Sequence, residues 1–397
     1  MKCWIAKKER KEEILVEENE LTAEKIAKQW KDYQFPLHEE GTTHNGSGFR
    51  KPQLAAICAI KAFFSMDDSE PGLVVMPTGT GKTDVIISSI IFNALTHVLI
   101  LVPNTALKKQ LAKRCRDLGI LSRIATSLPL KPIVYEMDTK PSSFNQVIQK
   151  SNIIITTYQL ASTMFGEIKV STPVLDCIFM DEAHHTESTN WAQLKSLCYY
   201  SNIRCLQLTA TPYREDDKYI SGRLLYQYSM AQAIEDGYFA PITCESVSVY
   251  NPKWEDKEIA KKSLAILKAD LQEGLNHVLL VRANTQKKAR HLFQTYYCEQ
   301  VSGYPARLIT SDHKEPDKNP DLSQEIKEGR CRILVCVDMF GEGVDFPNLK
   351  IAALHDRFSS LPIYLQFIGR ITRNNEQKIG TAKFVVNRIS KGCTKAL

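Results

Sequence analysis

The sequence predicts an α/β protein built from two parallel-sheet units of similar size. Short apolar runs, each typical of a buried strand, alternate with segments that are long enough for a crossover helix. The alternation pauses at residues 235–241 and then resumes, which indicates two units joined near residue 241. Strands that alternate with helices form βαβ units, and their parallel sheet is covered by helices on both faces.

Composition narrows the class of protein. The chain has 397 residues, of which 43% are hydrophobic and 24% charged, as in an ordinary soluble protein of two or three domains. No apolar run approaches the roughly 20 residues needed to span a bilayer, and the charged N-terminus lacks the apolar core of a secretory signal. The eleven cysteines form no C-x-x-C pair, so we expect reduced thiols in the cytoplasm and neither disulfides nor a zinc site.

The first 45 residues are predicted to be an accessory segment and linker. They are highly charged and end in the polar stretch "HEEGTTHNGSG" at residues 38–48, which is typical of a linker. We therefore expect a first domain over residues 46–240 and a second over residues 241–397. The net charge of +6 is compatible with a polyanionic partner without identifying one.

Both domains contain a series of strand-like runs. In the first domain they lie at residues 73–76, 97–102, 152–157, 177–180 and 204–210. One intervening helix has its own start signal, because Ser143-x-x-Gln146 is a capping box. In the second domain the runs lie at residues 277–282, 306–310, 331–337, 350–356 and 381–387.

A phosphate-binding loop is predicted after the first strand, within "GLVVMPTGTGKTDVIISS" at residues 72–89. Met76 stands where the general pattern has its first glycine, but Gly81, Lys82 and Thr83 complete the remainder. Glycines allow backbone N–H groups to converge on an anion at the start of a helix. Lys82 suits the β- and γ-phosphates and the Thr83 hydroxyl suits Mg²⁺. A Gly/Thr-rich turn without a ligand is the plainer alternative.

Polar residues follow two later strands of the first domain. Asp181 and Glu182 come directly after residues 177–180, where ligands bind in open parallel sheets. The first acid can hold Mg²⁺ and the second can deprotonate the attacking water. The segment "LTATP" at residues 208–212 places two threonines after the next strand, either as a phosphate sensor or as an ordinary turn.

Arginines are concentrated near the end of the second domain. The segment "YLQFIGRITR" at residues 364–373 contains Gln366, Arg370 and Arg373, and residues three apart on a helix lie on one face. Guanidinium groups in this arrangement can act as arginine fingers on phosphate oxygens. Because the first domain has a phosphate loop and the second has the arginines, the sequence predicts an ATP cleft that closes between them.

In order and wording these segments resemble the superfamily 2 helicases of the DEAH type over about residues 46–390. "MPTGTGKT" resembles motif I, "LVPNTAL" (101–107) motif Ia, "IITTYQLA" (154–161) motif Ib, "DEAH" motif II, "LTATP" motif III, "VDMFGEGVDFP" (337–347) motif V and "QFIGRITR" motif VI. The last two are nearest to the helicase subunits of type III restriction enzymes. The resemblance implies two tandem RecA-like domains, ATP and Mg²⁺ as cofactors, and DNA or, as the second choice, RNA as the partner.

The resemblance also assigns roles to individual residues. For catalysis it implies Lys82, Asp181, Glu182, Gln366, Arg370 and Arg373. For ATP it implies Arg50, Gln53, Thr78, Gly79, Thr80, Gly81, Lys82, Thr83, Gly343 and Asp345, with Thr83 and Asp181 holding the metal. For nucleic acid it implies Pro103, Thr105, Thr157, Arg282 and Thr310, with contacts mainly to phosphates.

Three functions are compatible with these residues. The first is an ATP-dependent helicase or translocase, in a defence, restriction or repair system. The second is a nucleic-acid sensor that hydrolyses ATP and signals through partners without unwinding. The third is a nucleotide-gated scaffold with little turnover, which the intact Lys82, Glu182 and Arg370 disfavour. Because the chain ends soon after motif VI, we also expect partner subunits or further C-terminal domains.

Overall fold

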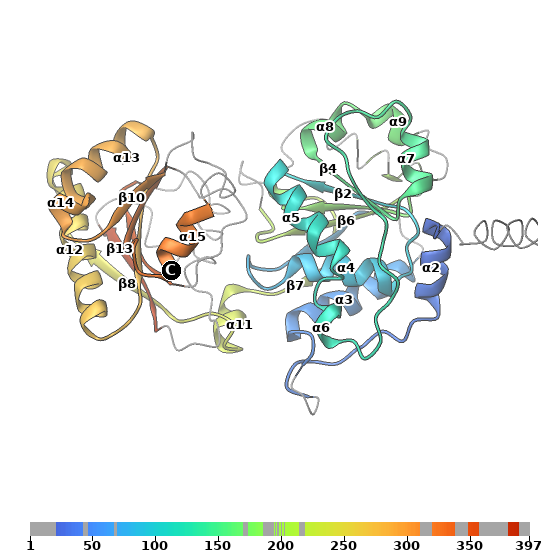
Figure 1. Ribbon diagram of the computed structural model, residues 1–397, viewed down its shortest axis with the longest axis horizontal. Helices are drawn as coiled ribbons and strands as arrows, with labels where there is room; N and C mark the ends of the chain where they lie inside the picture. The colour runs from blue at the N-terminus through green and yellow to red at the C-terminus, as the bar shows by residue number, and fades with distance from the viewer. Residues whose placement is uncertain are drawn as a thin grey trace, which may run out of the picture.

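The computed structural model describes the chain over residues 21–42, 47–66, 70–169, 174–185, 203–213, 219–309, 320–337, 348–356 and 380–388, and at residues 194, 196, 198, 199 and 201. The described residues form two α/β units, each with its own parallel sheet (Figure 1). The predicted fold class, two tandem RecA-like domains, is confirmed.

The first unit has a seven-stranded parallel sheet in the order β3-β4-β2-β5-β6-β1-β7. Its strands are β1 (Gly72–Val75), β2 (Val98–Val102), β3 (Val134–Glu136), β4 (Ile153–Thr157), β5 (Cys177–Asp181), β6 (Arg204–Thr209) and β7 (Arg223–Gln227). The central strands are almost entirely buried, because helices cover both faces of the sheet.

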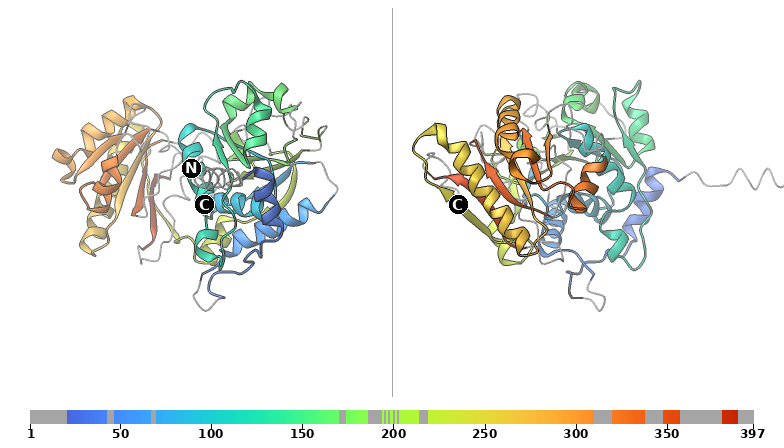
Figure 2. Two further views of the ribbon diagram at one scale, coloured as in Figure 1. Left: turned by 45° about the vertical axis from the view of Figure 1, so that its right-hand side comes forward. Right: turned by 60° about the vertical axis from the view of Figure 1, so that its left-hand side comes forward.

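Helices of the first unit lie on both faces of its sheet (Figures 1 and 2). They are α2 (Ala23–Lys31), α3 (Lys51–Phe64), α4 (Lys82–Phe92), α5 (Thr105–Arg116), α6 (Leu121–Ile124), α7 (Phe144–Lys150), α8 (Tyr158–Ser162), α9 (Phe165–Lys169) and a 3-10 turn at Ala183–His185. Alternate strand residues separate the two cores: Val74 packs with α2 to α6, whereas Val75 packs with α7 to α9.

The second unit has a six-stranded parallel sheet in the order β10-β11-β9-β12-β13-β8. Its strands are β8 (Ile242–Val247), β9 (Val278–Ala283), β10 (Ala306–Ile309), β11 (Ile333–Val337), β12 (Leu349–Leu354) and β13 (Ala382–Asn387). Its helices are α12 (Pro252–Gln272), α13 (Gln286–Leu292), a π-helical turn (Phe293–Tyr297), α14 (Glu299–Ser302) and α15 (Pro320–Lys327). One face packs on α12 and α13 and the other on α15. Helix α11 (Met230–Glu235) lies between the two sheets in the chain.

Every strand predicted from an apolar run is present, but three strands escaped prediction. These are β3, β7 and β8, and each lies at the edge of its sheet. Edge strands bury less of their surface, so their sequences lack a continuous apolar run: β3 has no fully buried residue, and β8 has none either. The predicted capping box also starts a helix, since Ser143 accepts a hydrogen bond from the Gln146 N–H at 3.4 Å before α7.

Part of the predicted accessory segment is an integral layer of the first unit. Helix α2 buries Trp30 against α4 and its neighbours, and the Trp30 Nε1 donates to the Leu130 carbonyl at 2.8 Å. The Asn152 side chain donates to the Ala23 carbonyl at 2.9 Å. In the predicted linker, backbone bonds join residues 38 and 40 to Phe49. Helix α2 is therefore packed on the first unit, which the highly charged sequence conceals.

Two expectations from composition can be compared with the described residues. Among them, no helix combines the length and the apolarity that crossing a bilayer requires. The cysteines within the described ranges are free thiols.

We expect the Trp30→Ala substitution to destabilise the first unit by about 3–5 kcal/mol, because it removes a large buried side chain. Trp30 is only 3% exposed. The matched control is Lys28→Ala on the exposed face of the same helix, which we expect to change stability by less than about 0.5 kcal/mol. Denaturant unfolding followed by circular dichroism measures the free energy of unfolding of both variants. An effect of Trp30→Ala as small as that of Lys28→Ala would show that α2 is dispensable for the core.

Candidate active site

Three loops that carry the predicted catalytic residues lie side by side at one edge of the first sheet. Strand β6 pairs in parallel with both β1 and β5, so these three strands end at the same edge. The phosphate loop follows β1, Asp181 and Glu182 end β5, and Thr209 ends β6. The sheet order therefore assembles residues that are more than 100 positions apart, as expected for a ligand site beyond the carboxyl ends of parallel strands.

The phosphate loop has a backbone that only glycine adopts easily at two positions. Gly79 and Gly81 have φ values of 93° and 95°, and Gly81 directly precedes the first residue of α4. Between them, the Thr80 N–H and hydroxyl both bond to the Pro77 carbonyl, at 3.2 and 2.7 Å. The Thr78 hydroxyl is buried and has no hydrogen-bond partner among the described residues. The loop is thus a rigid turn at a helix N-terminus, which suits an anion.

Lys82 connects the phosphate loop to the acids of β5. Its Nζ donates to the Met76 carbonyl at 3.3 Å and lies 3.2 Å from Glu182 Oε1. Both side chains are buried, Lys82 being 7% exposed and Glu182 9%. The structure thus places the predicted phosphate-binding lysine and the predicted general base in direct contact.

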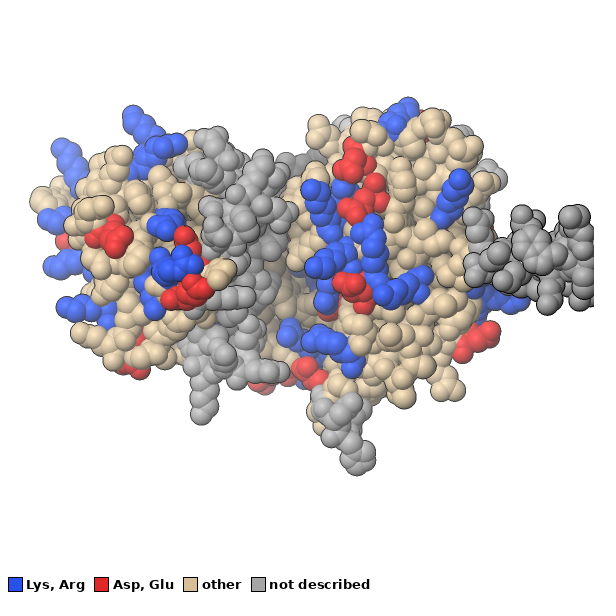
Figure 3. Space-filling model, viewed as in Figure 1, with Lys and Arg blue, Asp and Glu red and all other residues tan. Residues whose placement is uncertain are grey.

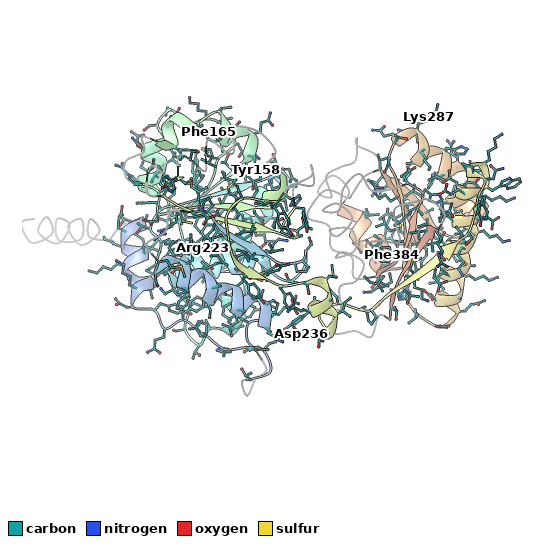
Figure 4. The ribbon with its side chains drawn as sticks, turned by 180° about the vertical axis from the view of Figure 1, so that it is seen from behind. Tyr158, Phe165, Arg223, Asp236, Lys287 and Phe384 are labelled. Atoms are coloured by element: carbon teal, nitrogen blue, oxygen red, sulfur yellow. The ribbon has the colours of Figure 1, made fainter. Side chains whose placement is uncertain are left out.

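Glu182 is held in a strained conformation. Its φ is 51°, in the left-handed region that few residues other than glycine adopt. Its N–H donates to Asp181 Oδ1 at 3.1 Å, and the Tyr158 hydroxyl donates to the Asp181 carbonyl at 2.7 Å (Figure 4 labels Tyr158). These contacts fix the turn, so the strain is concentrated at the predicted general base.

A chain of contacts leads from Glu182 to the threonines of the next strand. His184 Nδ1 lies 3.6 Å from Glu182 Oε2 and 3.1 Å from the Thr209 hydroxyl. The Thr209 hydroxyl in turn donates to the Thr211 carbonyl at 2.9 Å. The segment "LTATP" is therefore bonded to the acidic turn through His184, and its role as a sensor stays a prediction.

Arg50 and Gln53 brace the phosphate loop from the start of α3. Arg50 Nη1 donates to the Gly79 carbonyl at 3.0 Å, and Gln53 Oε1 accepts from the Arg50 N–H at 3.0 Å. Gln53 is 2% exposed, and a Cβ added to Gly81 would lie 2.0 Å from its Nε2. The pair thus contacts the backbone of both loop glycines.

The residues predicted to hold Mg²⁺ are compatible with that ion. Oxygen ligands from carboxylates and hydroxyls are those that Mg²⁺ prefers. Asp181 ends β5 and Thr83 lies in the first turn of α4, and β5 and β1 are separated by one strand only. The buried carboxylate of Asp181, which is 8% exposed, is chemically suited to a cation in the phosphate site.

The predicted nucleic-acid contacts fall into two groups. Pro103 and Thr105 lie at the start of α5 after β2, and the Thr157 hydroxyl caps α8 after β4. These two strands are neighbours, so their ends are adjacent. Arg282, by contrast, lies within β9 and is 2% exposed. The contact of Arg282 with a phosphate stays a prediction.

Several predicted residues lie outside the described residues. They are Thr310, Gly343, Asp345, Gln366, Arg370 and Arg373. The predicted arginine fingers and the predicted contribution of the second unit therefore remain predictions.

Sequence reasoning also missed residues that shape the site. Asp84 is buried on α4, where its Oδ1 accepts from Arg114 at 2.5 Å and from the Ile120 N–H at 3.0 Å. An acid in the first turn of a helix is common, so the sequence gives no sign of this role. His184 lies within the "DEAH" segment. Its hydrogen bond with Thr209 could not be predicted, because the order of the strands in the sheet brings these two residues together.

Two family models and several known proteins match this chain. The family described as "Type III restriction enzyme, res subunit" matches residues 47–214, and "Helicase conserved C-terminal domain" matches residues 261–375. The chain is similar to the DNA 3'-5' translocase XPB2 of Sulfurisphaera tokodaii, at 24% identity over 83% of this chain and 82% of the relative. It is also similar to the putative ATP-dependent helicase IRC3 of Saccharomyces cerevisiae, at 24% identity over 77% of this chain and 46% of the relative.

Solved structures share the fold. The ATP-dependent type ISP restriction-modification enzyme LlaBIII, bound to DNA, matches with a TM-score of 0.58 and 17% identity, over 86% of this chain and 28% of that one. The DUF1998 helicase MrfA, bound to DNA and AMPPNP, also matches with a TM-score of 0.58 and 17% identity, over 85% of this chain and 48% of that one. The chain thus spans less than half the length of IRC3 and of both these proteins.

We expect Gly81→Ala to abolish measurable nucleotide binding. The added Cβ would meet Gln53 at 2.0 Å, and the positive φ would be strained by about 1–2 kcal/mol. Gly41→Ala is the matched control, because Gly41 has a φ of 79° and nothing within 4 Å of the added atom. Titration with a fluorescent ATP analogue distinguishes the two, and retention of affinity in Gly81→Ala would exclude this loop as the phosphate site.

Proposed function

We propose that the chain is a superfamily 2 helicase, in the group related to type III restriction enzymes, and that it hydrolyses ATP to move along DNA. The single observation that carries the assignment of the catalytic residues is the Lys82–Glu182 pair, 3.2 Å apart beyond the ends of β1 and β5, two strands that β6 separates. A cation for the phosphates and an acid for the attacking water meet there.

In this mechanism the phosphates of ATP compete with Glu182 for Lys82. The β- and γ-phosphates bind against the loop that contains Gly79 and Gly81, and Lys82 neutralises part of their charge. Glu182 then becomes available to accept a proton from the attacking water. Its fixed turn and its burial keep the carboxylate oriented, so hydrolysis begins only when the phosphates have displaced the lysine.

Thr83 and Asp181 are the residues that would hold Mg²⁺. When bound there, Mg²⁺ would neutralise charge that develops on the phosphate oxygens. The remaining charge falls to residues of this chain: Lys82 in the first unit and, as the sequence predicts, Arg370 and Arg373 in the second. Gln366, Gly343 and Asp345 complete the proposed contribution of the second unit.

The contacts from Glu182 through His184 to Thr209 provide a path from the phosphate site to the neighbouring strand end. A shift of Glu182 away from Lys82 would change its 3.6 Å approach to His184 and thereby the hydrogen bond to Thr209. Side-chain networks of this type have discrete arrangements, which is what a switch driven by hydrolysis requires.

The proposed DNA contacts lie at the start of α5 and at Thr157. The N-terminus of α5 presents backbone N–H groups, and Thr105 is exposed beside it. Figure 3 shows Lys and Arg side chains, with some acids among them, on the face of the first unit that carries α5. Lys109 and Lys113 of α5 are exposed, and lysine contacts to phosphates carry most of the affinity of such proteins for DNA.

DNA is proposed before RNA because of the relatives. A relative of which the match covers 82% is named a DNA translocase, and the first unit matches a restriction-enzyme family. The free cysteines of the described residues support a cytoplasmic location, where thiols stay reduced. Action with partner subunits, in a defence or repair system, is part of the same proposal.

We expect Glu182→Gln to lower the rate of ATP hydrolysis by about 100-fold or more while ATP still binds, because glutamine keeps the shape but cannot accept the proton. The matched control is Glu167→Gln, an acid on the surface of the same unit that pairs with Lys140. A phosphate-release assay and an ATP-binding assay measure the two effects. Full hydrolysis by Glu182→Gln would assign the general base to another residue.

We expect DNA to stimulate hydrolysis more than RNA of the same sequence, and the stimulation to fall as salt rises. The test is the ATPase rate with single- and double-stranded DNA and RNA at stated salt concentrations. Displacement of a third DNA strand from a triplex then reports movement. Stimulation without displacement would favour the sensor, and indifference to every nucleic acid would overturn the proposal.

A further inference from the structure

The segment that connects the two sheets passes directly over the start of α3. After β7 ends at Gln227, the chain forms α11, turns through Asp236 and Tyr238, and enters β8 at Ile242. Figure 4 labels Asp236 on this connector, between the two units. We define the connector as residues 228–241. Arg50 and Gln53, which contact the phosphate loop, also lie at the start of α3. The start of α3 therefore contacts both the predicted nucleotide site and the connector.

Lys51, at the start of α3, makes two contacts with the connector. The Lys51 N–H donates to the Tyr238 hydroxyl at 3.1 Å, and the Lys51 ammonium lies 2.9 Å from Asp236 Oδ1. The Tyr228 hydroxyl donates to Asp236 Oδ2 at 2.7 Å. The hydrogen bonds from Tyr228 and from Lys51 lower the pKa of Asp236, so this carboxylate is ionised at neutral pH.

Tyr238 also contacts Arg50 through its ring. The Arg50 guanidinium carbon lies 5.5 Å from the ring centroid, within the range of a cation–π interaction. Partial burial raises the pKa of Tyr238 to about 12, so the ring stays neutral at physiological pH. Arg50 therefore has two fixed contacts, the Tyr238 ring and the Gly79 carbonyl at 3.0 Å.

These two contacts fix the orientation of the planar guanidinium group of Arg50. An arginine side chain loses up to about 2 kcal/mol of rotamer entropy when it is fixed, and contacts made beforehand remove that loss from ligand binding. The guanidinium is flat and stacks on aromatic rings. Arg50 is only partly buried, so part of it remains accessible beside the phosphate loop.

We propose that Tyr238 is a positioning residue for nucleotide recognition: it holds the Arg50 guanidinium in the orientation that stacks on the purine base of ATP. This inference rests on the proposed function and adds a residue of the connector to the ATP site. The base would lie against Arg50, while the phosphates bind the adjacent glycine loop. Gln53, which bonds to the Arg50 backbone, stands beside it.

The test compares two ligands that share phosphates and differ in the base. Isothermal titration measures the dissociation constants of ATP and of inorganic tripolyphosphate for the full chain. Tyr238→Leu removes the ring. We expect it to weaken the binding of ATP by about five- to tenfold, a factor within the range of a partly buried cation–π contact, and to leave the binding of tripolyphosphate unchanged. Tyr238→Phe keeps the ring and loses the bond to Lys51, so it should bind ATP nearly as the unchanged protein does.

Tyr226→Leu is the matched control, since Tyr226 is a partly buried tyrosine of β7. We expect it to leave the ratio of the two dissociation constants unchanged. Equal weakening of ATP and tripolyphosphate by Tyr238→Leu, or unchanged binding of both, would overturn the inference. Failure of the unchanged protein to bind either ligand would instead contradict the proposed function, so the two failures are distinguishable.

Discussion

The parallel pairing of β6 with β1 on one side and β5 on the other is the constraint on which the site depends. It brings the phosphate loop, the acidic turn and Thr209 to one edge without any of them being close in sequence. Hydrophobic burial on both faces of the sheet stabilises this order, since the central strands are fully buried. The packing of the core thus determines the positions of the polar residues, which lie at the ends of the strands.

The Lys82–Glu182 pair is better explained by function than by stability. Removing two charges from water costs several kcal/mol per ion, and a buried pair often contributes no net stability. Here the acid also has a left-handed backbone, which is unfavourable for a residue with a Cβ. Glu182, the predicted general base, thus combines a buried charge with an unfavourable backbone conformation. Apolar residues of similar volume at these two positions would avoid the cost of burying the charges, so the pair is best explained by its function.

The central strands and the phosphate loop could be predicted from the sequence, because burial on both faces and positive φ values impose clear patterns. The edge strand β8 could not, since it is half-exposed and has no continuous apolar run. Helix α2 was concealed in the same way by its charged outer face. The burial of Arg282, which is 2% exposed, could not be predicted either, because a motif gives a residue's place in the chain and not its exposure.

The connector limits where the two units can move relative to each other. Phe239 belongs to the first core and Ala240 is 3% exposed, while the Pro241 carbonyl already accepts a hydrogen bond from Ala382 of the second sheet at 3.1 Å. Proline fixes its own φ and restricts the residue before it, so little freedom remains at this junction. The exposed Lys51–Asp236 pair contributes little by itself, whereas burial of Phe239 and Tyr228 anchors the chain firmly. Any hinge rotation at the connector must therefore act on very few backbone bonds, directly beside the residues that brace the nucleotide.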